Sequence, residues 1–202
     1  MKLYYSPAAC SLAVHIALRE TGTAFDPIKV DLAKHRLDDG SDYYAISPRG
    51  YVPLLEFDDG SRHTEVASLL QFVADLDPSQ ALIGAARSAR RLAVVEWLTF
   101  VSSELHKVFS PWLWHKETAE STKVAVRERL ATRFAELDAH FKGHEYLADE
   151  FSVADAYAFT IINWSHFVMV PMKAYPNLQA YMARVAARPQ VQAALRAEGL
   201  AK

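Results

Sequence analysis

Hydrophobic and polar residues follow different periods in the two parts of the chain, and the period changes near residue 78. Before that point, runs with the two-residue period of half-buried strands predict strands at residues 3–5, 25–32, 52–57 and 61–64. Helical spacing of apolar residues predicts helices at residues 9–20 and 65–76. The segment from residue 34 to residue 44 is polar, and whether it is helical is ambiguous. This order of elements predicts a small mixed sheet with helices packed on it.

After residue 78 almost the whole chain has helical periodicity. The apolar positions predict one long helix or a broken pair at 86–115, a helix at 119–142, and two or three more after residue 151. Such a series of helices predicts a helical bundle. We therefore expect three parts: an α/β domain at residues 1–77, a linker at 78–85 and an all-helical domain at 86–202.

The composition excludes several kinds of site and partner. Hydrophobic residues make up 51% and charged residues 23% of the chain, which is typical of a folded globular protein. The formal net charge of -2 provides no basic surface for nucleic acid or an anionic membrane. A single cysteine excludes an internal disulfide, and no His and Cys cluster predicts a metal site. Without a signal-peptide pattern or an apolar run of about eighteen residues, we expect a cytoplasmic protein with no membrane or nucleic-acid partner.

The cysteine of this chain, Cys10, lies in a turn that leads into the first predicted helix. Free backbone N–H groups and the positive end of the helix dipole favour a thiolate at such a position. A lone cysteine is also often a small buried apolar residue. The position therefore leaves a reactive and a structural role open.

Two further segments have features of a peptide-binding site. Val52 precedes Pro53 at the start of a predicted strand, where a cis peptide bond would leave the Val52 backbone groups free to pair with an extended peptide. Glu65 precedes a predicted helix, where its carboxylate suits an ammonium group while the helix N–H groups suit a carboxylate. Together these groups fit an α-amino acid head group. The alternatives are an ordinary proline loop and a glutamate that only stabilises its helix.

One polar stripe and one capping motif stand out in the helical part. Helical spacing aligns four polar side chains, with Lys107 beside them: Thr99, Ser103, His106 and Ser110. Such a stripe is either solvated surface or one wall of a cleft.

Ser152 and Asp155 form an S-x-x-D capping box before an apolar helix, which indicates a structural role.

The order and spacing of these motifs resemble the bacterial, cysteine-containing beta-class glutathione S-transferases over essentially the whole chain. The segments that carry the resemblance are MKLYYSPAACS, ISPRGYVPL, TE before the second helix, EWLTF followed by LHK, and FSVADAY. The resemblance implies a thioredoxin-like N-terminal domain, a helical-bundle C-terminal domain and a homodimer with a role in detoxification. It also implies glutathione as co-substrate, a hydrophobic small-molecule electrophile as second substrate, and no tightly bound cofactor.

The resemblance also implies roles for individual residues. Cys10, Ser11 and His106 would form the catalytic set, with Cys10 facing the glutathione sulfur and able to form a mixed disulfide with it. Residues of both domains would contact glutathione: Ala9, His35, Tyr51, Val52, Pro53, Glu65, Val66 and Lys107. A neighbouring subunit would complete the γ-glutamyl pocket with Thr99, Ser103 and Glu104. Aromatic residues that equally suit a core would line the electrophile pocket: Phe109, Trp112, Trp114 and Trp164.

Two residues depart from the pattern of the class. Val66 stands where the class has Ser or Gly, and the loss of a hydroxyl that binds a carboxylate costs roughly 1.5–3 kcal/mol, or about ten- to hundredfold in affinity. His35 stands where the class tends to have Lys, and a neutral imidazole is a weaker partner for the glycyl carboxylate. Lys34 or Arg36 would then take over that contact.

Three functions are compatible with these features. The first is a glutathione transferase that stabilises the glutathione thiolate, attacks hydrophobic electrophiles and has Cys10-dependent redox activity. Lowering a thiol pKa by about two units requires about 2.7 kcal/mol, more than a helix dipole typically supplies, so hydrogen bonds from the Cys10 amide, Ser11 or His106 are needed. The second is a glutathione-dependent thiol–disulfide oxidoreductase. The third is a non-catalytic binding module that has lost glutathione binding through Val66 and His35.

Overall fold

The computed structural model describes residues 1–201, and its contacts divide the chain into two compact units. The first unit combines Met1–Gln80 with the C-terminal segment that begins at Arg188, and the second unit is Ala81–Ala187. The last helix, which we expected in the helical domain, thus groups with the sheet. The domain boundary at residues 78–85 stays a prediction.

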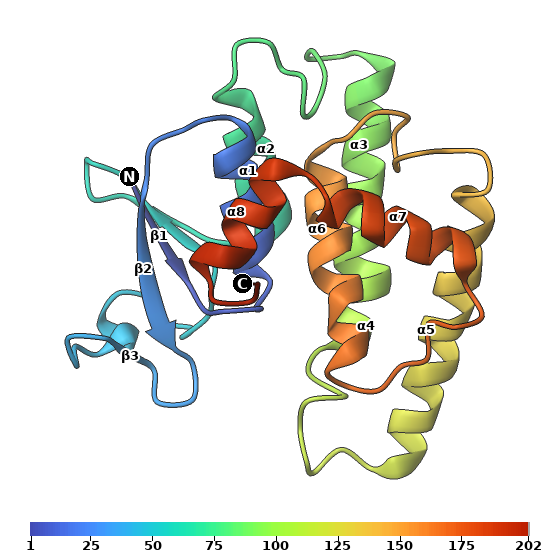
Figure 1. Ribbon diagram of the computed structural model, residues 1–202. Coiled ribbons are helices and arrows are strands. Elements are labelled where there is room, and N and C mark those ends of the chain that lie inside the picture. Colours follow the sequence, from blue (N-terminus) through green and yellow to red (C-terminus); the bar gives the residue numbers. More distant parts are fainter. Residues whose placement is uncertain (202) are drawn as a thin grey trace. The chain divides into compact units, whose positions relative to one another are not determined.

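The first unit is built on a five-stranded mixed sheet of order β3-β2-β1-β4-β5. Its parallel strands β1 and β2 lie side by side in Figure 1. Strand β1 (Lys2–Tyr5) pairs in parallel with β2 (Asp26–Asp31) and antiparallel with β4 (Leu54–Glu56). The short strands β3 (Arg36–Leu37) and β5 (Arg62–His63) complete the two edges. The sheet confirms the expected mixed topology. Strand β3 lies inside the polar segment at residues 34–44, for which the sequence left a helix open.

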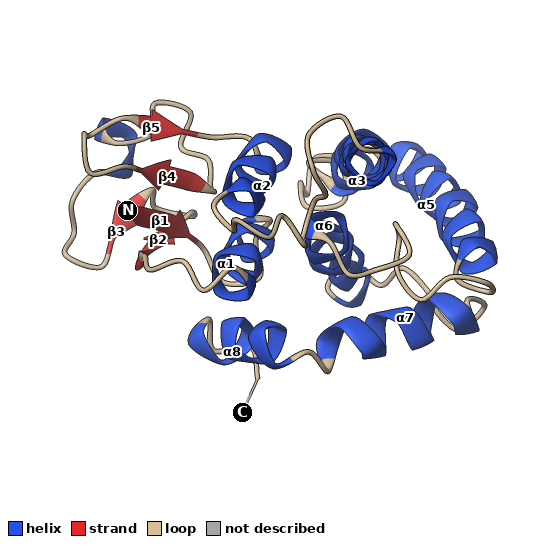
Figure 2. Ribbon diagram, turned by 90° about the horizontal axis from the view of Figure 1, so that it is seen from above, coloured by secondary structure: helices blue, strands red, loops and turns tan. Residues whose placement is uncertain are grey.

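Three helices belong to this sheet unit. Helices α1 (Ser11–Glu20) and α2 (Val66–Asp75) lie on one face of the sheet, and α8 (Pro189–Ala197) packs against α1 (Figure 2). Because α1 contacts the sheet, α2 and α8, eight of its ten residues are buried. It is followed by Gly22, whose φ of 68° is a left-handed conformation that glycine adopts without strain.

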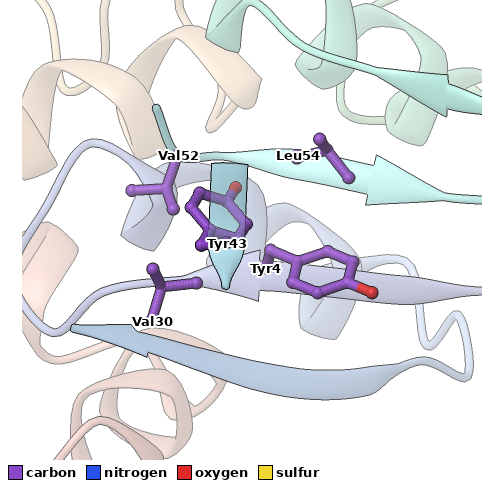
Figure 3. Close-up of a cluster of buried hydrophobic side chains, with 5 residues drawn as sticks. All are labelled: Tyr4, Val30, Tyr43, Val52 and Leu54. Atoms are coloured by element: carbon purple, nitrogen blue, oxygen red, sulfur yellow. The ribbon is translucent and has the colours of Figure 1, made fainter. Parts of the chain in front are cut away.

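A hydrophobic cluster supports the strands that carry the candidate site. Tyr43, in the 3-10 turn η1 (Tyr43–Ala45), is fully buried in this cluster (Figure 3), together with Tyr4, Val30, Val52 and Leu54. The Tyr43 hydroxyl donates to the Tyr51 carbonyl oxygen at 2.8 Å, and burial raises the pKa of Tyr43 to about 12. The tyrosine therefore ties the loop before Pro53 to the core.

The second unit is a bundle around α6 (Val153–Ile162), whose ten residues are all buried. Helix α6 packs against α3 (Ala89–Phe100) and α7 (Pro176–Ala186), and α5 (Glu120–His140) packs against α7. A helix that is apolar on all sides is typical of the centre of a core. Over residues 1–201, none of the helices combines the length and the apolar character needed to cross a membrane.

The expected helix at 86–115 is a broken one. After α3, a π-helical turn, η2 (Val101–His106), and a short helix, α4 (Lys107–Phe109), continue the chain. A π-helical turn changes the register of side chains after it, so helical spacing alone misplaces them. Turns of this kind often occur at functional sites.

The S-x-x-D motif caps α6, as the sequence predicted. The fully buried Asp155 carboxylate accepts four hydrogen bonds: from the N–H groups of Leu147 and Ser152 and from the hydroxyls of Ser152 and Tyr181. Burial raises the pKa of Asp155, and these hydrogen bonds oppose that shift. Asp155 therefore joins the start of α6 to α7 and to the segment before α6.

Candidate functional site

Cys10 occupies the position immediately before α1, in the first unit. Its half-buried side chain donates a hydrogen bond from Sγ to the Val52 carbonyl oxygen at 3.2 Å. The amides of the first helical turn favour a thiolate, whereas a carbonyl acceptor favours the protonated thiol. The geometry thus fits the thiol form of Cys10. The same hydrogen bond joins Cys10 to Val52, the edge that the sequence predicted to bind a peptide.

Ser11 is engaged with the backbone of the loop that presents Cys10. The residue is fully buried, and its hydroxyl donates to the Ser6 carbonyl and accepts from the Ser6 amide, both at 3.2 Å. These two bonds close the turn between Ser6 and α1. The hydroxyl is therefore occupied in holding the loop, whereas we expected it to donate to the sulfur.

The C-terminal segment of the same unit also holds this loop. The fully buried Glu198 carboxylate accepts from the Ala8 amide at 3.1 Å and from His15 Nδ1 at 2.9 Å. His15 Nε2 accepts from Arg19 Nε at 3.0 Å, so the proton of the neutral ring is on Nδ1. Ala8 has a left-handed φ of 62°, which its contact with Glu198 helps to hold. Sequence reasoning missed Glu198 because 190 positions separate it from Ala8.

The Val52–Pro53 peptide bond is cis, as the sequence predicted. The Val52 side chain is buried in the hydrophobic cluster, and Ala9 packs against the same cluster. Tyr51 is 66% exposed, and its carbonyl oxygen accepts hydrogen bonds from two buried hydroxyls, including that of Ser47 at 3.3 Å. The Val52 edge is thus firmly anchored next to Cys10.

Glu65 stands immediately before α2 with a strained backbone. Its φ of 71° is left-handed, which is uncommon for a non-glycine residue and occurs often at functional sites. Its carbonyl accepts from the Ser68 and Leu69 amides, so the amides of Val66 and Ala67 precede the first helical bonds. The Glu65 carboxylate is 71% exposed and makes no capping hydrogen bond to α2. This arrangement has the groups that an amino acid head group requires.

The two departures from the class pattern have different surroundings. Val66 is 6% exposed, so its side chain is packed inside the unit and offers no polar group at the helix start. The His35 ring contacts the Tyr44 ring in a tilted arrangement, with 4.4 Å between centroids, and its buried Nδ1 has no hydrogen-bond partner among residues 1–201. A Cβ at Gly50 would lie 2.7 Å from that nitrogen, so this position, with φ of 66°, requires glycine. Nε2 is the ring nitrogen left for a ligand.

In the second unit, His106 ends the π-helical turn η2, next to the exposed Lys107. Its Nδ1 lies 2.6 Å from the Tyr157 hydroxyl on α6, and its ring makes an edge contact with Trp164. Burial, and then the positive charge of Lys107, lowers the pKa of His106 to about 4. The ring is therefore neutral at neutral pH, and His106 is not a solvated surface residue.

The low pKa of His106 predicts a loss of stability in acid. The ordinary pKa of histidine is 6.5, so between about pH 7 and about pH 4 the unfolded chain gains a proton that the folded chain does not. Stability falls in this range by up to about 3 kcal/mol from this residue. Urea unfolding of the wild type and of His106→Gln at both pH values measures the difference. Equal acid losses in the two proteins would contradict the prediction.

The three residues expected at the γ-glutamyl pocket of a neighbouring subunit make contacts within the second unit. The exposed hydroxyls of Thr99 and Ser103 each donate to a carbonyl one turn earlier in the helix. The Glu104 carboxylate binds Arg129 at 2.9 Å and Arg133 at 2.6 Å, and these hydrogen bonds lower its pKa. Sequence reasoning missed both arginines because α5 carries many charged residues without a marker that distinguishes them.

The aromatic residues expected in the electrophile pocket divide into core and surface. Phe109 is fully buried and contacts the rings of Phe134 and Trp164, so it is a core residue. Trp164 is 6% exposed and makes an edge contact with Trp114. Trp112 and Trp114 are 46% and 44% exposed. These two side chains therefore contribute exposed apolar surface to the second unit.

Known proteins resemble both units of the chain. The family described as "Glutathione S-transferase, N-terminal domain" matches residues 8–76, and "Glutathione S-transferase, C-terminal domain" matches residues 100–189. A glutathione S-transferase of Escherichia coli O157:H7 is 42% identical over 99% of this chain and 100% of its own length.

Two solved structures extend this likeness to the fold. A sphingomonad glutathione S-transferase in complex with glutathione is 44% identical, with a TM-score of 0.93, over 100% of both chains. A bacterial beta-class glutathione S-transferase of Sphingomonas chungbukensis is 44% identical over 99% of this chain and 100% of its own, with a TM-score of 0.93. The resemblance seen in the sequence motifs is thereby confirmed over the whole chain.

Proposed function

The chain belongs to the glutathione S-transferase family, and on that premise we propose that it binds glutathione along the edge formed by Cys10, Val52 and Glu65. The relatives support a glutathione transferase and do not favour a dedicated oxidoreductase or a non-catalytic module. The observation that carries the proposed site is the hydrogen bond from the Cys10 thiol to the Val52 carbonyl. It joins the position of the sulfur to the edge that pairs with the cysteinyl residue of glutathione.

Each part of glutathione has a partner in this proposal. The Val52 backbone pairs with the cysteinyl residue, whose sulfur faces Cys10. Glu65 binds the γ-glutamyl ammonium, and the free amides at the start of α2 bind the neighbouring carboxylate. Nε2 of His35 and the 77% exposed side chain of Lys34 face the glycyl carboxylate. Without a hydroxyl at Val66 the binding is weaker, but the backbone contact is retained.

The reaction requires the glutathione thiol to lose its proton. A free thiol has a pKa of about 8.5 and is only a few per cent ionised at about pH 7. Hydrogen bonds to the anion, worth roughly 1.5–3 kcal/mol each, shift this equilibrium. By resemblance to the class, we assign the donors as the Cys10 amide and Nε2–H of His106. This assignment requires the Tyr157 hydroxyl, 2.6 Å from His106 Nδ1, to donate to that nitrogen, so that the ring proton is on Nε2. His106 acts as a neutral donor, because its pKa is about 4.

The bound thiolate then attacks an electrophilic carbon. A carbon–sulfur bond forms, and the leaving group departs with its electron pair. With a glutathione mixed disulfide as substrate, the Cys10 thiolate attacks the glutathione sulfur and the other thiolate leaves, which produces a mixed disulfide at Cys10. The exposed Trp112 and Trp114 suit a hydrophobic electrophile.

The assembly is part of the same proposal. A cytoplasmic homodimer with a role in detoxification would place Thr99, Ser103 and Glu104 of one subunit at the γ-glutamyl pocket of the other. Glu104 is already held by Arg129 and Arg133, so this network would present a fixed carboxylate to the head group. The resemblance to the class supports the dimer.

Conjugation kinetics test the assigned roles. With glutathione and a chloronitroaromatic electrophile, His106→Ala is expected to lower kcat/KM by about tenfold or more, because one donor to the thiolate is lost. Cys10→Ala is expected to lose disulfide exchange and to retain conjugation. His166→Ala, which removes an exposed histidine of the same unit, serves as control and is expected to be unchanged. If the Cys10→Ala, His106→Ala double variant keeps both activities, the assignment is wrong.

A further inference from the structure

Arg49 contacts Glu65 at the start of α2, although no motif gave this arginine a role. Its Nη1 lies 3.2 Å from Glu65 Oε1, and the two side chains are 68% and 71% exposed. An ion pair this exposed contributes little to stability, because water screens both charges. Its main consequence is therefore local: a full positive charge stands beside the carboxylate that binds an ammonium group.

The γ-glutamyl head group of glutathione is a zwitterion with an ammonium and a carboxylate on one carbon. Glu65 matches the ammonium. The start of α2 balances the charge of the ligand carboxylate only in part. The N–H groups there carry only partial charge, and the buried Val66 side chain adds no donor. A guanidinium has five N–H donors in a planar fork that fits a carboxylate, and the contact with Glu65 uses Nη1.

We propose that Arg49 binds the γ-glutamyl carboxylate of glutathione and so replaces the hydroxyl that position 66 lacks. In the complex, the ligand ammonium lies beside the Glu65 carboxylate, and the ligand carboxylate lies beside the Arg49 guanidinium. This inference rests on the proposed glutathione site and adds to it a residue that sets specificity for an intact γ-glutamyl group.

Two other roles for Arg49 give different results. If the arginine only positions Glu65, its loss weakens recognition of the ammonium and leaves recognition of the carboxylate intact. If it competes with the ammonium for Glu65, its loss strengthens binding. Ligands that lack one of the two charges distinguish these roles.

Calorimetry with three ligands provides the test: glutathione, γ-aminobutyryl-cysteinylglycine, which lacks the carboxylate, and glutaryl-cysteinylglycine, which lacks the amino group. Arg49→Met is expected to weaken glutathione and the glutaryl analogue by about tenfold each, and to leave the aminobutyryl analogue unchanged. An equal loss for the aminobutyryl analogue would show that Arg49 acts through Glu65 and would overturn the proposal. Unchanged or tighter binding of glutathione would overturn it as well.

Matched variants complete the design. Lys2→Met removes another ion-paired, half-exposed cation of the same unit and is expected to bind glutathione like the wild type. Adding Val66→Ser to Arg49→Met restores a donor and is expected to recover part of the lost affinity, whereas no recovery would count against the shared carboxylate. A wild type that fails to bind glutathione contradicts the proposed function itself, whereas a loss confined to Arg49→Met concerns this inference alone.

Discussion

Replacement of Asp155 by alanine is expected to lower the free energy of unfolding by about 4 kcal/mol, because a buried carboxylate with several partners is removed. Four donors, from Leu147, Ser152 and Tyr181, would lose their acceptor in a site without water access. Each buried donor left unpaired costs roughly 1–3 kcal/mol, less what local relaxation recovers. Since α6 is the fully buried centre of its unit, loosening its start affects the whole bundle.

Urea unfolding measures this effect, and two variants serve as controls. Ser152→Ala removes one hydroxyl and leaves the carboxylate in place, so a loss of about 1 kcal/mol is expected. Asp155→Asn keeps one acceptor oxygen and is expected to fall between the two. If Asp155→Ala were no less stable than Ser152→Ala, the carboxylate would not be the centre of this network.

Replacement of Glu198 by alanine has the second largest expected effect, a loss of about 3 kcal/mol. The change would remove the carboxylate that accepts hydrogen bonds from the partly buried Ala8 amide and from Nδ1 of the fully buried His15. It would also release the left-handed Ala8 and with it the loop that presents Cys10. We therefore expect lower stability together with a more mobile Cys10.

Two measurements separate these consequences. Urea unfolding gives the stability, and the alkylation rate of Cys10 in native conditions reports the mobility and exposure of its loop. Glu198→Gln keeps one acceptor oxygen and is expected to lose less stability, whereas Glu96→Ala, an exposed position on α3, is expected to behave like the wild type. An unchanged Cys10 alkylation rate in Glu198→Ala would show that the carboxylate does not hold the loop.

Local sequence signals predicted most of the first unit. The alternating apolar runs located β1, β2, β4 and β5, and the proline at position 53 correctly indicated a cis bond. The S-x-x-D motif predicted the Asp155 cap because all its atoms come from four consecutive residues. Its additional partner Tyr181 lies 26 positions away and has no local signal.

Other contacts could not be predicted because they depend on tertiary structure. Helical spacing placed His106 on a polar stripe, but this residue ends a π-helical turn and its half-buried ring contacts Tyr157 on α6. Glu198 lies at the far end of the chain from the loop that it holds. The Ser11 hydroxyl was a candidate donor to the thiolate, whereas it bonds the backbone of Ser6, five residues earlier.

Calorimetric titration of the reduced protein with glutathione near pH 7 tests the central claim most directly. We predict a dissociation constant between micromolar and low millimolar, and about tenfold or weaker binding to Glu65→Gln, because the ammonium loses its charged partner. No heat of binding at about 10 mM glutathione would contradict the account. A dissociation constant above that concentration corresponds to a binding free energy of less than about 3 kcal/mol.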